Sequence, residues 1–187
     1  MNPSIDISSV VLHTGRLTLR PWQQEDLEDF YAYASVDGVG QMAGWLPHQS
    51  RAETQAILDL FIRQKKTFAI QHQNQVIGSL GIECYDEDQH PDLAPWRGRE
   101  IGYVLAKPFW GRGLATEAAQ AVIDYLFRVE DLDFIIAGHF TRNAPSARVI
   151  EKCGFRYLST IPYETQYGAV ETSVENILWN PARPAGL

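Results

Sequence analysis

Residues 100–118 read EIGYVLAKPFWGRGLATEA, and this stretch decides what the chain can be. Its apolar beginning predicts a strand, after which Gly111 and Gly113 form a tight turn that opens a helix. Glycine at these two positions lets the backbone approach a ligand closely. Because free N–H groups and the helix dipole attract anions, the stretch predicts a phosphate-binding turn for a nucleotide-like ligand.

Other interpretations of this turn stay open when the stretch is taken alone. The dinucleotide-binding fingerprint needs a third glycine where this chain has Thr116, and it needs repeated βαβ units where only one is visible. A Walker loop needs Gly-Lys followed by Ser or Thr, which the stretch lacks. The turn could also do no more than begin a helix.

A second segment, residues 143–155, fits the same ligand. Asn143 can cap a helix with its side chain, and its amide can also donate and accept across a cleft. Residues 141–156 carry four basic side chains and one acidic side chain, in a chain whose net charge is −7. This positive patch suits an anionic cofactor, although Arg148 and Lys152 could equally belong to a solvated helix face.

The remaining patterns predict a mixed α/β fold. Two alternating runs, at residues 67–71 and 75–83, predict a hairpin, and residues 99–140 predict a parallel strand–helix–strand unit. Ser50 with Glu53 has the spacing of a capping box at the start of a helix. We therefore expect a twisted, mostly antiparallel sheet with a central parallel βαβ unit and helices on both faces. Further strands are predicted at residues 16–20, 155–162 and 174–179, and further helices at residues 23–35 and 143–153.

Composition narrows the class of protein. A chain of 187 residues predicts one domain, 1–187, with an ordered core of about residues 12–180 behind a partly ordered leader. The net charge of −7 argues against direct nucleic-acid binding. No stretch approaches the ~18 apolar residues of a membrane helix, and no basic n-region precedes Arg16, so a soluble, cytoplasmic protein is expected. Two distant cysteines and five scattered histidines form no disulfide framework and no metal site.

Taken together, these segments resemble the GNAT superfamily of acyl-CoA-dependent N-acyltransferases. The closer resemblance is to its RimJ/RimL type, the ribosomal-protein N-acetyltransferases and their relatives. It covers most of the chain and is carried by TGRLTLRP at residues 14–21, EIGY at 100–103, WGRGLATEA at 110–118, and Asn-x-x-Ser with Glu-Lys-x-Gly-Phe between 143 and 155. Trp110 replaces the usual first Gln or Arg of the phosphate loop, as is common in the RimJ/RimL type. Ile150 replaces a tyrosine that is often the proposed general acid, so that role must fall elsewhere.

The resemblance implies acetyl-CoA as co-substrate and no metal. Main-chain N–H groups of residues 111–116 would hold the pyrophosphate. The strand at residues 103–105 would splay from the next parallel strand, the pantetheine arm would fill the gap, and a main-chain N–H near Val104 would polarise the thioester carbonyl. The cofactor-binding residues implied are Tyr103, Val104, Leu105, Trp110, Gly111, Arg112, Gly113, Leu114, Ala115, Thr116, Asn143, Ser146, Arg148 and Lys152.

Three residues are candidates for catalysis. Glu100 could take the proton of the amine, directly or through water, or it could only pair with Arg97 or Arg99 at the strand entrance. Ser146 could hydrogen-bond the CoA sulfur and protonate the leaving thiolate, or be an ordinary residue of a first helical turn. Asn143 could contact the pantetheine amides or serve as a cap alone.

The expected function is transfer of the acetyl group to a primary amine by direct attack in a ternary complex. The acceptor could be a protein N-terminus, possibly ribosomal, or a small molecule, and the protein a monomer or homodimer. An acidic loop, with Asp86, Glu87, Asp88 and Asp92, could attract a cationic acceptor or only aid solubility. Trp45 could wall the acceptor pocket or belong to the core. A non-catalytic CoA-binding module and a nucleotide-binding protein remain the alternatives.

Overall fold

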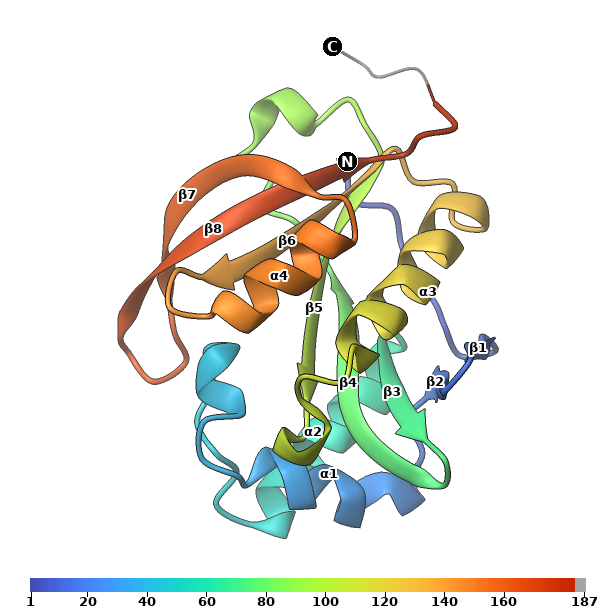
Figure 1. The fold of residues 1–187 in the computed structure, drawn as a ribbon, viewed down its shortest axis with the longest axis vertical. Helices are drawn as coiled ribbons and strands as arrows, with labels where there is room; N and C mark the ends of the chain where they lie inside the picture. The colour runs from blue at the N-terminus through green and yellow to red at the C-terminus, as the bar shows by residue number, and fades with distance from the viewer. Residues whose placement is uncertain (184–187) are drawn as a thin grey trace.

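A single eight-stranded sheet runs through the computed structural model, which describes residues 1–183 (Figure 1). Its strands lie in the order β1-β2-β3-β4-β5-β6-β8-β7. The mixed, mostly antiparallel sheet that the sequence predicts is confirmed. The strand bounds are β1 (Leu12–His13), β2 (Leu17–Pro21), β3 (Thr67–His72), β4 (Gln75–Glu83), β5 (Gly98–Leu105), β6 (Phe134–Phe140), β7 (Arg156–Glu164) and β8 (Val170–Trp179).

The parallel pair of the sheet is β5 with β6, joined by helix α3 (Leu114–Arg128), as the sequence predicts. Pairing extends over three positions only, from Gly98 opposite Phe134 to Glu100 opposite Ile136. Gly98 permits this contact, because a Cβ at that position would lie 2.1 Å from the Phe134 ring. Both strands continue beyond their last pair, so they separate within the sheet.

Helices cover both faces of the sheet, as predicted. On one face, α1 (Leu27–Ala34) and α2 (Arg51–Gln64) pack around a core cluster that contains Phe30 and Leu58. On the other face, α3 and α4 (Ala144–Lys152) cover a larger cluster built on β2 to β6. Short 3₁₀ turns lie in the connections: η1 (Gln24–Asp26), η2 (Gly40–Met42), η3 (Pro91–Leu93) and η4 (Lys107–Phe109).

The start of α2 has the predicted cap with one difference. Ser50 accepts a hydrogen bond from the Glu53 N–H at 3.2 Å, as an N-cap should. The Glu53 carboxylate reaches back to the N–H of Gln49 at 2.7 Å, one residue before the cap. The helix therefore begins where the spacing predicts, with the returning bond shifted by one position.

The segment before Leu12 differs from the partly ordered leader that we expected. Ile5 and Ile7 are buried in the core cluster on the α3 side, and the Ile7 N–H donates to the Lys65 carbonyl at 2.8 Å. Asn2 and the Tyr85 main chain exchange two hydrogen bonds, at 3.1 and 3.0 Å. Two apolar residues are too short a pattern to predict this packing, because their partners lie far along the chain.

Candidate active site

The separation of β5 from β6 opens a cavity of about 1010 Å³. Its walls come from both strands, from the turn before α3, and from the beginning of α4. Every cofactor-binding residue implied by the sequence lines it except Arg112, whose guanidinium lies over the Phe109 ring at 5.3 Å. The lining residues are Tyr103, Val104, Leu105, Trp110, Gly111, Gly113, Leu114, Ala115, Thr116, Asn143, Ser146, Arg148 and Lys152.

The turn before α3 offers a row of main-chain donors. Gly111 and Gly113 have φ values of +73° and +75°, which only glycine adopts without strain, and Gly113 is the N-cap of the helix. In the described chain, the N–H groups of residues 111–113 donate to no acceptor. Those of residues 114–116 belong to the first helical turn, where no partner exists within the helix. The turn therefore presents consecutive donors at the positive end of the α3 dipole.

Arg16 lies beside this turn in an ion pair with Glu117, a contact that sequence reasoning missed. Its guanidinium donates to the Arg112 carbonyl at 2.9 Å and to Glu117 at 2.7 Å. Thr14 holds the other Glu117 oxygen at 2.6 Å. Burial would raise the pKa of Glu117, but these hydrogen bonds outweigh it and leave the pKa below its usual value. No local pattern could reveal this contact, because Arg16 lies about a hundred residues before the turn.

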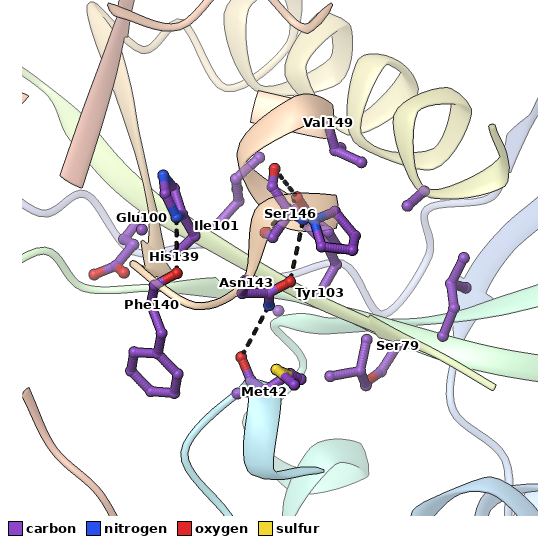
Figure 2. Close-up of a pocket in the computed structure, with 18 of the residues that line it drawn as sticks. Met42, Ser79, Glu100, Ile101, Tyr103, His139, Phe140, Asn143, Ser146 and Val149 are labelled. Carbon is purple, nitrogen blue, oxygen red and sulfur yellow. Dashed lines mark hydrogen bonds between the residues drawn. The ribbon is translucent and has the colours of Figure 1, made fainter. Parts of the chain in front are cut away.

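The beginning of α4 forms the opposite wall. Asn143 Oδ1 accepts from the Ser146 N–H at 3.2 Å, and Asn143 Nδ2 donates to the Met42 carbonyl at 3.3 Å (Figure 2). The predicted cap is thus confirmed, and the same side chain ties α4 to the η2 turn. Arg148 and Lys152 also line the cavity and form no ion pair within residues 1–183. A contact of Asn143 with pantetheine remains a prediction.

The main-chain N–H that faces the opening beside Val104 is that of Tyr103. The Ala106 N–H donates to the Ile77 carbonyl of the β4 side at 2.7 Å. Main-chain groups of alternate residues in a strand face opposite neighbours, so the Val104 N–H belongs to the ladder with β4 and the Tyr103 N–H points toward β6. The Tyr103 N–H is therefore the candidate for the donor expected near Val104, and its role remains a prediction.

Glu100 lies where the parallel pairing ends. It stands directly opposite Glu83 across the β4–β5 ladder, and its Oε1 comes within 3.8 Å of the Cβ position of Gly138. Neither arginine suggested by the sequence pairs with it. Arg99 donates to the Pro3 carbonyl and to Cys84 Sγ, and Arg97 donates to the carbonyls of residues 130 and 131.

The surroundings of Glu100 disfavour its charged form. Burial, followed by the carboxylates of Glu175 and Glu83, raises the pKa of Glu100 to about 7. Glu83 is paired with Lys66, while Glu175 accepts from His90 at 2.6 Å and from Ser159 at 2.7 Å. No residue in the described chain donates a hydrogen bond to the Glu100 side chain. It is thus a carboxyl group that can exchange a proton near neutral pH.

The face of the cavity around Glu100 is acidic. Glu83, Asp86, Glu100 and Glu175 all line it. Of the four loop carboxylates considered for steering, only Asp86 reaches the lining, while Glu87 accepts a hydrogen bond from Asn2. The two parts of the cavity therefore differ in charge. Cationic side chains lie on α4, and the carboxylates come from β4, β5, β8 and the loop after β4.

Trp45 and Ile150 also have clear positions. Trp45 lines the cavity and also packs against the core, where its ring covers Gly40 so closely that a Cβ there would lie 2.1 Å away. Trp45 therefore belongs to the core and to the cavity wall, and its role in an acceptor pocket remains a prediction. Ile150 is 4% exposed and lies in the core on the α3 side, so its position brings no polar group to the cavity.

Comparison with known families agrees with this geometry. The model of the acetyltransferase (GNAT) domain matches residues 16–156, more than half of the chain. The chain belongs to the GNAT family. It is 34% identical over 153 residues to the uncharacterized N-acetyltransferase p20 of Bacillus licheniformis, a match that covers 78% of this chain and 82% of that protein. This GNAT protein is accordingly an acyl-CoA N-acyltransferase.

Solved structures share its fold. A GNAT-family acetyltransferase from Bacillus anthracis superposes with a TM-score of 0.79 at 23% identity, covering 91% of this chain and 99% of that one. RimJ of Mycobacterium smegmatis, in complex with CoA-disulfide, superposes with a TM-score of 0.73 at 22% identity, covering 94% and 88%. In the GNAT chain described here, no helix among residues 1–183 has the length and apolarity needed to cross a membrane. Nor does that range contain a group of three or more His, Cys, Asp or Glu side chains that could hold a metal ion.

The environment of Glu100 predicts how stability depends on pH. A carboxyl group with a raised pKa binds its proton more tightly in the native state, so the free energy of unfolding falls as pH rises from about 4.5 to about 7. Glu100→Gln removes this effect. We expect the variant to exceed the parent by about 1–2 kcal/mol at pH 8 and to match it at pH 4, in urea denaturation.

Glu117→Gln is the matched control. Because the pKa of Glu117 is lowered, its charged form stabilises the native state, and the variant should be less stable than the parent at pH 8. If Glu100→Gln also destabilises the protein at pH 8, the carboxyl group has a counter-charge that this structure lacks.

Proposed function

We propose that this protein transfers the acetyl group of acetyl-CoA to a primary amine by direct attack in a ternary complex. The observation that carries the proposal is the opening between β5 and β6, which ends at a turn rich in free main-chain donors. One elongated ligand with an anionic end and an amide-bearing arm would satisfy both features. The RimJ structure with CoA-disulfide supports this choice of ligand.

The cavity suits CoA at each of its parts. The N–H groups of residues 111–116 would hold the pyrophosphate, with Arg148 and Lys152 contributing positive charge. The pantetheine arm would lie along the unpaired side of β5, where main-chain groups have no strand partner. The Tyr103 N–H would then donate to the thioester carbonyl, which gains negative charge as the amine attacks.

Glu100 is our candidate for the group that removes the proton. The neutral amine forms a bond to the thioester carbon, the C–S bond breaks, and the electron pair leaves with sulfur. The nitrogen then has one proton too many, which Glu100 can accept directly or through water. A base whose pKa lies near 7 suits this task at neutral pH.

The acidic lining favours an acceptor that carries positive charge. Carboxylates concentrate cations near the cavity and speed their encounter with it. Amines, whether on small molecules or at a protein N-terminus, are cations before they lose a proton. The likeness to RimJ makes the N-terminal amine of another protein one candidate acceptor, as expected for the RimJ/RimL type. Small-molecule amines are the other candidates.

Gly113→Asp tests where the phosphate binds. The substitution places a carboxylate among the N–H donors of the turn, so we expect the Kd for CoA to rise at least about 100-fold in calorimetry. Gly168→Asp is the matched control, because Gly168 has a similar φ of +79°, has no neighbour within 4 Å, and is not part of the cavity lining. It should bind CoA like the parent. Circular dichroism should show both variants folded, and unchanged affinity in Gly113→Asp would place the phosphate elsewhere.

Glu100→Gln tests the proposed base. With acetyl-CoA and a panel of aliphatic amines, we expect the parent to release free thiol, and its kcat/KM to rise with pH through about 7. The variant should lose about 10²-fold in kcat and lose that step in the profile, while KM for acetyl-CoA stays the same. The pKa of an aliphatic amine lies several units above 7, so deprotonation of the amine gives a separate rise in the pH profile. An unchanged profile in the variant would refute a role of Glu100 as base.

A further inference from the structure

A hydrogen bond between two side chains joins β5 to α4 across the cavity. Tyr103 Oη lies 2.9 Å from Ser146 Oγ and 3.3 Å from the Ser146 carbonyl oxygen (Figure 2). Both residues line the cavity, and 43 positions separate them in the chain. The contact spans the region where β5 has left β6, so it links the two walls that the ligand would separate.

Either hydroxyl group can be the donor of the 2.9 Å hydrogen bond, and the proposal depends on the arrangement in which Tyr103 donates. Burial raises the pKa of Tyr103 well above its usual value, so its hydroxyl keeps its proton throughout the working range. The Ser146 carbonyl belongs to the first turn of α4 and has an acceptor role inside the helix. When Tyr103 donates to Ser146 Oγ, the Ser146 proton is left for another acceptor, and no described residue takes it.

Asn143, the other uncharged polar side chain at the beginning of α4, is already engaged. Asn143 accepts a hydrogen bond from the Ser146 N–H and donates one to the Met42 carbonyl. Ile150 is a buried apolar residue and brings no hydroxyl group to this wall. The His139 ring nitrogen Nδ1 lies 3.0 Å from the Phe140 carbonyl. When Tyr103 is the donor, the Tyr103–Ser146 pair leaves the Ser146 hydroxyl proton free for a ligand.

We propose that Tyr103 is a positioning residue for Ser146. Its hydroxyl donates to Ser146 Oγ and thereby turns the Ser146 O–H toward the sulfur of the departing thiol. This inference rests on the proposed acetyl transfer and assigns one part of it. Tyr103 would act twice, since its main-chain N–H faces the thioester carbonyl while its side chain fixes the donor to sulfur.

The step balances without a further reactant. The C–S bond breaks, sulfur takes the electron pair, and the Ser146 O–H stabilises the resulting thiolate by a hydrogen bond. An alkyl thiol has a pKa of about 8.5, so the thiolate can leave as an anion and gain its proton from water. The proton released by the amine goes to Glu100, and Tyr103 ends the step as it began.

The test is a double-mutant cycle measured by free-thiol release. Tyr103→Phe should lower kcat about 3- to 10-fold, the effect of one lost hydrogen bond, with KM for acetyl-CoA and the melting temperature nearly unchanged. In a Ser146→Ala background, adding Tyr103→Phe should change kcat less than about 2-fold, because its partner is gone. Tyr125→Phe, which removes a hydroxyl bonded to Glu130 outside the cavity, is the matched control and should keep the parental kcat.

Replacing Tyr103 by 4-aminophenylalanine provides a second variant that keeps the ring and a donor. It should retain more kcat than Tyr103→Phe. Equal kcat in the parent and Tyr103→Phe, or equal losses with and without Ser146, would overturn the inference while leaving acetyl transfer intact. A parent that releases no thiol with any amine would instead contradict the proposed function itself.

Discussion

The early end of the β5–β6 pairing is the constraint on which the rest of the site depends. Two parallel strands that stay paired along their whole length leave no room for a ligand between them. Two strands with no paired residues would leave the sheet in two parts. Here Gly98 lets the strands touch against Phe134, and the ladder stops two residues later at Glu100. Beyond it, β5 continues with one edge bonded to β4 and the other open. The main-chain groups along this edge have no strand partner, so they are free to bond a ligand or water.

The two sides of the opening carry opposite charge. On the α3 and α4 side, free N–H groups, Arg148 and Lys152 favour an anion. On the other side, Glu83 and Glu100 stand directly opposite each other, an arrangement of like charges that destabilises a sheet. The two sides suit an anionic donor and a cationic acceptor that meet between them.

The sequence predicts the framework well, because apolar periodicity reports which face of each element is buried. The hairpin of β3 and β4, the β5–α3–β6 unit and the cap at Asn143 follow from local patterns. The cofactor-binding residues that line the cavity were implied by the family resemblance. What the sequence misses depends on contacts between distant residues. Arg16 reaches the α3 turn, Glu175 raises the pKa of Glu100, and Ile7 enters the core, each across a separation that no local pattern records. The Tyr103–Ser146 contact belongs to the same class, since each residue alone has an ordinary place in its strand or helix.

Hydrogen–deuterium exchange with saturating CoA tests most directly whether the opening is the donor site. Free main-chain N–H groups exchange quickly until a ligand accepts from them. The account predicts slowed exchange in residues 111–116 and at Tyr103, on the two surfaces that the cofactor would bridge, with the β7–β8 turn around Gly168 unchanged. Protection confined to other segments, or none in residues 111–116 at a CoA concentration that saturates binding, would contradict it.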